Sequence, residues 1–299
     1  MLSREIIRNF KIYFLLGAIF MALSAYSRFY FSEMYRIEPL GISSIDLLDI
    51  LKFVFLMIFL GSFGLALLSS MFDVLILKKL LKNTSPKIAL SIGIPAQALM
   101  IILIVQVLDF VYVTTLPLIY EGPVEPTGPS ENMFLIIHLI VAVGMSKVLI
   151  EIDRKLGPGN LWKMLTGKFF KPREEERIFM FIDLQSSTSI AERIGHLEYS
   201  KFLQSCFQDF SIVDYYRADI YQYVGDEVVV SWSPIKGVKN DNFLKAFFAF
   251  TDLLKRKREH YQKEYGISPY FKAGANIGPV IITEVGDIKR EITYHGDTL

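Results

Sequence analysis

The sequence predicts a four-helix transmembrane bundle in the first half of the chain and an α+β domain in the second half. Of the 299 residues, 52% are hydrophobic, and a mean hydropathy of +0.36 is unusual for a soluble protein of this size. The apolar residues concentrate before about residue 152, and the composition changes from Arg173 onward. We therefore divide the chain into a transmembrane domain at 1–152, a connector at 153–172 and a second domain at 173–299.

Four apolar stretches are long enough to cross a bilayer, which takes roughly 20 helical residues. They run from about Phe10 to Phe31, Leu51 to Leu77, Ile88 to Val111 and Met133 to Ile152. The first stretch is too long for a signal peptide and lacks a small-residue cleavage site, so it is predicted to remain as a span.

Basic residues cluster on one side of the predicted bundle. They precede the first span, fill the loop between the second and third spans, and follow the fourth, whereas the loops at 32–50 and 112–132 carry one arginine between them. The positive-inside rule then predicts a multi-pass protein of the cell membrane whose two termini are cytoplasmic. The basic residues concerned are Arg4, Arg8, Lys11, Lys78, Lys79, Lys82, Lys87, Arg154, Lys155, Lys163, Lys168 and Lys171.

Several classes of site are excluded by composition. A single cysteine, Cys206, leaves no disulfide within the chain and no cysteine-based zinc site. Four scattered histidines have no metal-ligand spacing. The net charge of +1, with no basic stripe, indicates no nucleic-acid partner, whereas the lipid bilayer is an expected one.

Three ionisable residues fall in or near the predicted spans. His138 lies inside the fourth span, and we expect it to bond to a neighbouring helix, although an ionisable group at such a place is a functional candidate by default. Asp73 and Asp109 lie near span ends, where we expect them to reach the interface. No ligand site is predicted in the bundle.

The connector begins with a Gly-Pro-Gly break at 157–159, which ends the fourth helix. Leu161 to Phe170 is predicted to form a short amphipathic helix at the membrane surface, because aromatic residues, Phe169 among them, alternate there with lysines. It is either a simple spacer or a transmitter between the two domains, and the sequence does not decide between them.

The second domain is predicted to be an α+β sheet with helices on one face, in the order βααββαββ followed by one more strand. Strands are predicted at 177–183, 219–223, 227–232, 270–277, 280–285 and 291–294, and helices at 187–194, 198–213 and 242–265. Two hairpins are expected, one turning at 224–226 and the other at Gly278-Pro279.

Two aspartates occupy special positions in this pattern. Asp183 ends the first strand, and Asp226 lies in the turn of the first hairpin. If these strands are neighbours, both carboxylates project from one edge of the sheet. Paired aspartates without histidine favour a hard cation such as Mg²⁺ or Mn²⁺. Taken singly, each has a structural explanation, as a helix-capping or a hairpin-turn residue.

The segment that follows Asp183 opens a helix with Ser186, Ser187 and Thr188. Backbone N–H groups at such a helix start hold phosphate oxygens well. Two aspartates beside a phosphate-binding helix start are the parts of a two-metal phosphoryl-transfer site, and we prefer this interpretation to a purely structural one.

These residues resemble the catalytic domain of the class III adenylate/guanylate cyclases. The segments at 181–188 and 223–229 resemble the two metal motifs of that family, 272–280 resembles a later strand pair, and 292–299 resembles the start of a segment that carries base-recognition and transition-state residues. The resemblance covers about 173–299. It implies a ferredoxin-like α+β fold that works as a homodimer, with each site built from two chains.

The resemblance also implies a reaction. Two Mg²⁺ or Mn²⁺ ions per site would be held by Asp183, Asp226 and the carbonyl of Leu184. The ribose 3′-hydroxyl of ATP would attack the α-phosphorus to give cyclic AMP and pyrophosphate. Catalysis of this kind depends on positioning and charge neutralisation.

Two departures from the family concern the base. The residue expected to be an adenine-contacting lysine is Gln222, and its aspartate partner is Thr293, which resembles one branch of bacterial adenylate cyclases. Glutamine offers a purine both a donor and an acceptor. Because neither residue matches the Glu/Cys pair of guanylate cyclases, ATP is the predicted substrate.

A third departure concerns the end of the chain. The family's transition-state Asn and Arg would follow Leu299, the last residue. We therefore expect the sequence to be a fragment or a truncated form, which binds nucleotide and metal better than it turns nucleotide over.

Other functions fit parts of the pattern. The turn at 224–228 superficially echoes the Gly-Gly-Asp-Glu-Phe turn of diguanylate cyclases, but it lacks the first glycine and the phenylalanine. A guanylate cyclase is a further alternative. A non-catalytic membrane receptor or scaffold with a degenerate cyclase-like domain is favoured by Gln222 and by the missing transition-state residues, and opposed by the presence of both Asp183 and Asp226.

Overall fold

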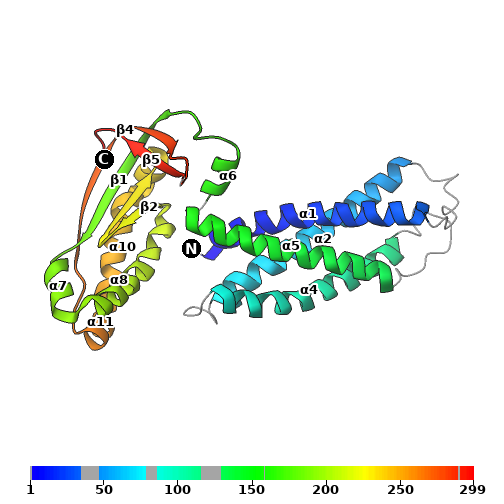
Figure 1. Cartoon of the computed structure of the whole chain (residues 1–299), viewed down its shortest axis with the longest axis horizontal. Coiled ribbons are helices and arrows are strands. Elements are labelled where there is room, and N and C mark those ends of the chain that lie inside the picture. The colour runs from blue at the N-terminus through cyan, green and yellow to red at the C-terminus, as the bar shows by residue number, and fades with distance from the viewer. Residues whose placement is uncertain (1, 35–46, 79–85, 116–128, 158, 289) are drawn as a thin grey trace. The chain divides into compact units, whose positions relative to one another are not determined.

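The computed structural model describes residues 2–34, 47–78, 86–115, 129–157, 159–288 and 290–299. The chain divides into two compact units, Leu2–Ile152 and Asp153–Leu299, each described here by itself (Figure 1). The connector at 153–172 therefore belongs to the same unit as the second domain.

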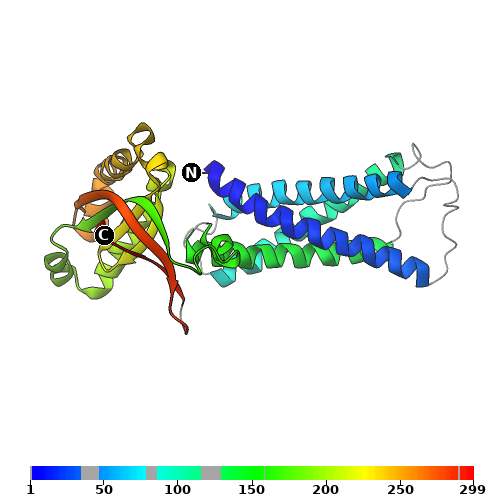
Figure 2. The same ribbon diagram turned by 90° about the horizontal axis from the view of Figure 1, so that it is seen from above.

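The first unit is built from four long helices that lie side by side in both views (Figures 1 and 2). Each contains a segment long and apolar enough to cross a membrane, at Arg4–Ser27, Leu51–Leu77, Ser91–Thr115 and Asn132–Leu156, as the sequence predicts. Their apolar core includes Tyr13, Leu65, Ile101 and Leu139. The helices are α1 Leu2–Met34, α2 Leu47–Met71 continued by the π-helix η2 Phe72–Leu77, α4 Pro86–Thr115 and α5 Pro129–Leu156.

Two expectations about ionisable residues in the spans are wrong. His138 bonds through Nδ1 to the Phe134 carbonyl of its own helix at 2.7 Å, not to a neighbouring helix. The side chain of Asp73 turns into the bundle and is only 11% exposed. Lys79, Lys82 and most of the loops used to orient the bundle lie outside the described residues, so the orientation stays a prediction.

The second unit contains an antiparallel sheet of five strands in the order β2-β3-β1-β4-β5. The central strand β1 pairs with β3 on one side and with β4 on the other. Its alternation places Ile178, Met180 and Ile182 on one face and Phe179 and Phe181 on the other. The strands are β1 Arg173–Leu184, β2 Asp219–Val224, β3 Glu227–Trp232, β4 Phe271–Val285 and β5 Glu291–His295.

Helices cover one face of this sheet, as the sequence predicts (Figure 1). The main core lies between them, where Phe202, Phe210 and Phe250 pack against the apolar face of β1 and against Trp232 of β3. The helical elements are α6 Asn160–Leu165, α7 Ser187–Ile194, α8 His196–Phe210, the 3₁₀-helix η4 Ser211–Tyr216, α9 Pro234–Val238, the 3₁₀-helix η5 Lys239–Asp241, α10 Asn242–Arg256 and α11 Arg258–Tyr265.

The predicted turn at Gly278-Pro279 does not exist, because β4 runs without interruption from Phe271 to Val285. Figure 2 shows it as a long, curved, orange-to-red strand. A side chain on Gly278 would lie 2.6 Å from Oγ1 of Thr298, whose hydroxyl donates to the Pro279 carbonyl at 2.9 Å. The glycine therefore makes room for a neighbouring segment instead of reversing the chain.

Two predicted helices are divided. The helix expected at 242–265 breaks at Lys257, where α10 ends and α11 begins. The bend lets the Lys257 ammonium and the Tyr261 hydroxyl both reach the carboxylate of Asp209 on α8. The helix expected at 198–213 ends at Phe210 and continues as the 3₁₀-helix η4.

The opposite face of the sheet carries a small aromatic cluster. The rings of Tyr221 on β2 and Tyr294 on β5 are 5.0 Å apart, and both contact Phe179 of β1. Since β2 and β5 are the two edge strands, their contact shows that the sheet curls until its edges meet over the central strand.

The connector differs from the amphipathic membrane-surface helix that its sequence predicts. Only α6 is α-helical, and Phe169 is 2% exposed within the second unit. The carbonyl of Phe169 accepts a hydrogen bond from the N–H of Glu284 on β4 at 3.0 Å. Trp162 and Phe170 remain exposed.

Candidate active site

The two candidate metal-binding aspartates lie at the same end of neighbouring strands. Asp183 on β1 is directly paired with Glu227, the first residue of β3. Asp226 immediately precedes Glu227, in the turn between β2 and β3. The structure therefore satisfies the condition on which the sequence prediction depended, that the two strands are neighbours.

The turn that holds Asp226 is only two residues long. Gly225, its first residue, has φ 61°, in the left-handed region that glycine adopts without steric cost. The short turn fixes the register of β2 against β3, so the backbone of Asp226 has little freedom to move away from Asp183.

Electrostatic effects show that the acidic groups act on one another. Burial raises the pKa of Glu227, and the charges of Asp183 and Asp226 raise it further. Burial also raises the pKa of Tyr199 on α8, with Asp226 and then Asp183 adding to the effect, while a bond to the Ser187 hydroxyl opposes it. The end of the sheet is thus a concentration of negative charge, which attracts a cation.

Lys272 neutralises part of this charge. It is directly paired with Asp183 across β1 and β4, and its ammonium lies 3.0 Å from the Asp183 carboxylate. The side chain of Lys272 is 68% exposed and that of Asp183 is 32% exposed, so the pair is accessible to water and ions.

The donor set fits a hard divalent cation. Within the described residues, no three His, Cys, Asp or Glu side chains are grouped closely enough to hold a metal ion. Asp183 and Asp226 with the backbone carbonyl of Leu184 would supply oxygen ligands only, and Mg²⁺ typically binds one or two carboxylates and keeps several waters. Such a cation would offset the charges of Asp183 and Asp226, which add to the effect of burial in raising the pKa of Glu227.

The predicted phosphate-binding residues lie next to this cluster, at the start of α7. Ser186 is the N-cap residue and has φ 59°, a left-handed conformation that is uncommon for a residue with a side chain. Ser186 and Thr188 are exposed, and Ser187 is half-buried beside Tyr199. The N–H groups of the first helical turn point away from the helix body and are suited to bind an anion.

The predicted base-binding residues occupy the two edge strands. Gln222 on β2 is exposed, and Thr293 on β5 is half-buried, with its hydroxyl 3.2 Å from Nε2 of His295. Their chain neighbours Tyr221 and Tyr294 contact one another. The structure therefore brings the two segments together but shows no contact between Gln222 and Thr293 themselves.

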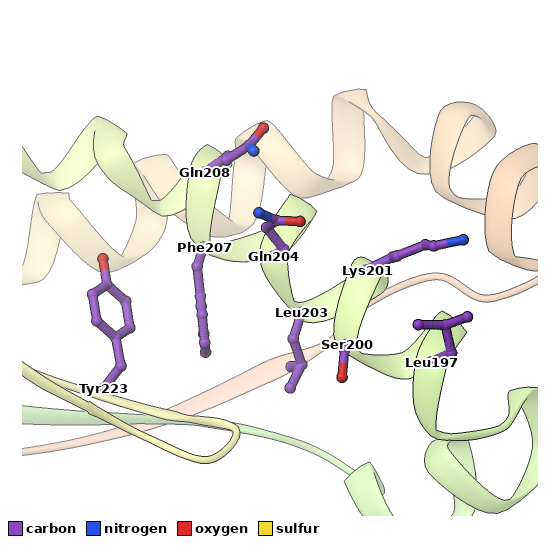
Figure 3. A pocket seen from close by; sticks show the side chains of 8 residues that line it. All are labelled: Leu197, Ser200, Lys201, Leu203, Gln204, Phe207, Gln208 and Tyr223. Carbon is purple, nitrogen blue, oxygen red and sulfur yellow. The ribbon is translucent and has the colours of Figure 1, made fainter. Parts of the chain in front are cut away.

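A shallow groove of about 690 Å³ lies on the outer face of α8 beside the hairpin that carries Asp226 (Figure 3). Tyr223, which is 48% exposed, faces Phe207 across it, and their rings are 4.9 Å apart. The groove is open and mostly apolar, which suits an apolar surface better than a charged triphosphate.

Sequence reasoning missed Tyr199, Glu227 and Lys272 as neighbours of the aspartates. Glu227 follows Asp226 in the chain, but its proximity to Asp183 depends on the β1–β3 register. Lys272 faces Asp183 only because β4 pairs with β1. No local pattern indicates either relationship.

The Lys272–Asp183 pair leads to a first prediction. Replacing Lys272 with Met removes a positive charge from the cation site, so Mn²⁺ should bind roughly two- to fivefold more tightly, since exposed pairs contribute less than about 1 kcal/mol. Titration followed by the Mn²⁺ electron paramagnetic resonance signal measures this change. Lys255→Met, which disrupts an exposed pair on α10, is the matched control. Weaker binding in the Lys272 variant would contradict the prediction.

Comparison with known proteins supports the family predicted from the motifs. No protein-family model matches the chain. Adenylate cyclase 2 of Rhizobium meliloti (strain 1021) is 33% identical over 180 residues, which are 60% of this chain and 49% of that protein. The chain thus spans about half the length of this curated relative. Because 180 aligned residues exceed those of 153–299, the similarity extends into the first unit.

Two solved structures are similar to part of the chain. A bacterial light-regulated adenylyl cyclase matches with a TM-score of 0.46 and 19% identity, over 56% of this chain and 50% of that chain. The adenylyl cyclase CyaB from P. aeruginosa matches with a TM-score of 0.40 and 20% identity, over 43% and 69%. The chain is thus similar to a curated adenylate cyclase, in agreement with the resemblance of its motifs to the class III nucleotide cyclases.

Proposed function

We propose that the protein is a membrane-bound adenylate cyclase, which converts ATP to cyclic AMP and pyrophosphate. The observation that carries the proposal is the meeting of Asp183 and Asp226 at one end of the β1–β3 pair. The adenylate cyclase name of the curated relative supports the choice of reaction.

Asp183, Asp226 and the Leu184 carbonyl would hold two Mg²⁺ or Mn²⁺ ions. Bound there, the ions would lower the pKa of the ribose 3′-hydroxyl and neutralise charge on the triphosphate. Glu227 adds negative charge beside them, and its pKa is raised by burial and, to a smaller extent, by the charges of Asp183 and Asp226.

The start of α7 would bind the triphosphate. The N–H groups of its first turn, at Ser187 and Thr188, can donate to phosphate oxygens, and Ser186 gives the turn its shape. In the reaction, the 3′-oxygen forms a bond to the α-phosphorus, the bond from that phosphorus to the bridging oxygen breaks, and pyrophosphate leaves. The 3′-hydroxyl proton passes to solvent.

Gln222 and Thr293 would contact the adenine, in an active site shared between two copies of the chain. The Gln222 amide can accept from the adenine amino group and donate to a ring nitrogen. The proposal of a homodimer rests on the family resemblance.

The first unit would hold the enzyme in the cell membrane as a multi-pass protein with cytoplasmic termini. Arg4, Arg8 and Lys11 near the start of α1, with Arg154 and Lys155 at the end of α5, supply the basic side required by the positive-inside rule. This orientation would put the nucleotide site in the cytoplasm, where ATP is found.

The test is product analysis with the full chain in lipid nanodiscs, supplied with Mn²⁺ and either ATP or GTP. We expect cyclic AMP from ATP, at least about tenfold faster than cyclic GMP from GTP, because base-edge hydrogen bonds discriminate well. Omission of the metal ion should abolish the product.

Each alternative function predicts a different result in this assay. Cyclic GMP as the main product would identify a guanylate cyclase, and cyclic di-GMP a diguanylate cyclase. Metal-dependent binding of ATP by folded dimers without any cyclic product would instead support a non-catalytic membrane receptor or scaffold.

A further inference from the structure

The membrane half contains a buried polar centre around Asp73. The Tyr13 hydroxyl of α1 donates to Asp73 Oδ2, and Nε2 of Gln97 on α4 donates to Oδ1 at 3.1 Å. The Lys147 ammonium of α5 lies 2.8 Å from the same Oδ1. One carboxylate on η2 therefore holds a side chain from each of the other three spans.

This centre is enclosed by the bundle. Tyr13 and Gln97 are 0% exposed, and the side chains of Lys147 and Asp73 are 9% and 11% exposed. A side chain on Gly93 would lie 3.0 Å from the Lys147 ammonium, so the glycine leaves room for that cation. Well-packed apolar residues stabilise a protein interior as well as a buried ion pair does, or better, which makes such a pair in a membrane span a functional candidate.

Asp73 also lies in an unusual backbone segment. The turn Phe72–Leu77 is π-helical, and its geometry lets the N–H of Lys78 donate to the Asp73 carbonyl, five residues back. Single π-turns are rare and occur frequently at functional sites. Relaxation to an α-helix would shift the register by one residue and rotate Asp73 by about 100°, away from its three partners.

The hydrogen bonding of the centre is incomplete. Within the described residues, Gln97 Oε1 and the hydroxyl oxygen of Ser69 are buried without a hydrogen-bond partner. A buried polar network in which some hydrogen bonds are missing is less stable, relative to an alternative conformation, than one in which every polar group is bonded. The π-turn with its bonds made and an α-helical turn with those bonds broken would be two discrete states of one segment.

The helix that carries Lys147 leads directly to the second unit. α5 runs to Leu156, and the second unit begins at Asp153. Asp153 Oδ1 accepts a hydrogen bond from the N–H of Gly159 at 3.0 Å, which ties the end of the helix to the connector. A rotation or shift of α5 would therefore reach the connector through the chain itself.

We propose that the Asp73–Lys147 pair is a two-state switch through which the membrane half controls the second unit. With the pair formed, α5 is held against the π-turn; with the pair broken, the turn relaxes and α5 is released. The switch in the bundle does not depend on the proposed function, but its effect on catalysis does.

The test measures the distance between spin labels on the two elements. Leu75 on η2 and Val148 on α5 are 40% and 51% exposed, so cysteines there accept labels without entering the core. The full chain carries Cys206→Ala, which removes the buried native thiol, and is measured in lipid nanodiscs by double electron–electron resonance.

We expect one distance for this parent chain and a second distance for Lys147→Met. Loss of one partner of a buried pair changes the ratio of the two states on the order of a hundredfold. Tyr13→Phe, which removes one hydrogen bond to Asp73, should produce the second distance to a smaller extent. Lys155→Met, an exposed lysine on the same helix, should leave the single distance unchanged.

A single unchanged distance in Lys147→Met would overturn the proposal. If that variant does not fold, Tyr13→Phe decides instead, and an unchanged distance there overturns it. The spin-label distances are measured without nucleotide. A failure to detect cyclic product would therefore refute the proposed function but not the switch in the bundle. Where product forms, Lys147→Met should change kcat several-fold at unchanged KM for ATP, and an unchanged rate despite a new distance would refute control of the second unit.

Discussion

Replacing Asp183 with Asn is expected to reduce the rate of cyclic AMP formation by about 10²- to 10³-fold, the usual cost of removing one electrostatic stabiliser of a transition state. Asparagine keeps the shape of the side chain but removes the charge that would hold a divalent cation. Because the Asp183–Lys272 pair is exposed to solvent, the fold should lose little stability.

Asp226→Asn should have an effect of similar size, and the double variant should be little worse than either single one. Residues that hold the same ions act as a unit, so their effects do not add. Initial rates with Mn²⁺ and ATP measure all three variants. Asp252→Asn, an exposed carboxylate on α10, is the control and should retain the original rate. Full activity in Asp183→Asn would refute the assignment of the site.

Replacing Trp232 with Ala is expected to destabilise the second unit by about 3–5 kcal/mol, as for other large aromatic side chains in a core. Trp232 is 0% exposed, and its indole N–H donates to the Tyr216 carbonyl at 3.0 Å. Removal of the ring leaves a cavity between β3 and the helices, together with a carbonyl that has lost its donor.

The rate at which Cys206 is labelled measures this loss of stability, because Cys206 is the single cysteine of the chain and is 0% exposed. Burial raises the pKa of its thiol to about 12, so at pH 8 the folded form holds almost no reactive thiolate. Labelling by a thiol reagent then requires opening of the core, and Trp232→Ala should accelerate it by about 10²- to 10³-fold. Trp162→Ala, at a site 64% exposed, should not change the rate. Equal labelling rates in both variants would contradict the prediction.

Much of the fold is predictable because its signals are local. The helix at 187–194 and the strand at 227–232 begin and end where the sequence predicts. The turn expected at Gly278-Pro279 was wrong because a glycine that avoids a clash with Thr298 has the same sequence signal as a glycine that reverses the chain. That contact joins residues far apart in the sequence, so a rule that uses only neighbouring residues cannot predict it.

The same distinction between local and long-range signals applies to the candidate active site and to the buried centre around Asp73. Asp183 and Asp226 are recognisable because strand ends and hairpin turns can be located in the sequence. Their neighbours Lys272 and Tyr199 required the strand register and the packing of α8. Asp73 was expected to reach the interface, since its position near a span end does not show that the π-turn directs its side chain inward.

The arrangement around Asp73 has a consequence for biosynthesis. A charged residue in a helix that enters the bilayer alone is costly. Tyr13 is synthesised before Asp73 and can bond to it as soon as the second helix is inserted, whereas Lys147 emerges 74 residues later. At roughly 5–20 residues per second, the carboxylate waits several seconds for its counter-ion. Until then that charge has only uncharged donors from the earlier helices, first the Tyr13 hydroxyl and then the Gln97 amide, so insertion of the last helix neutralises the centre as well as completing the bundle.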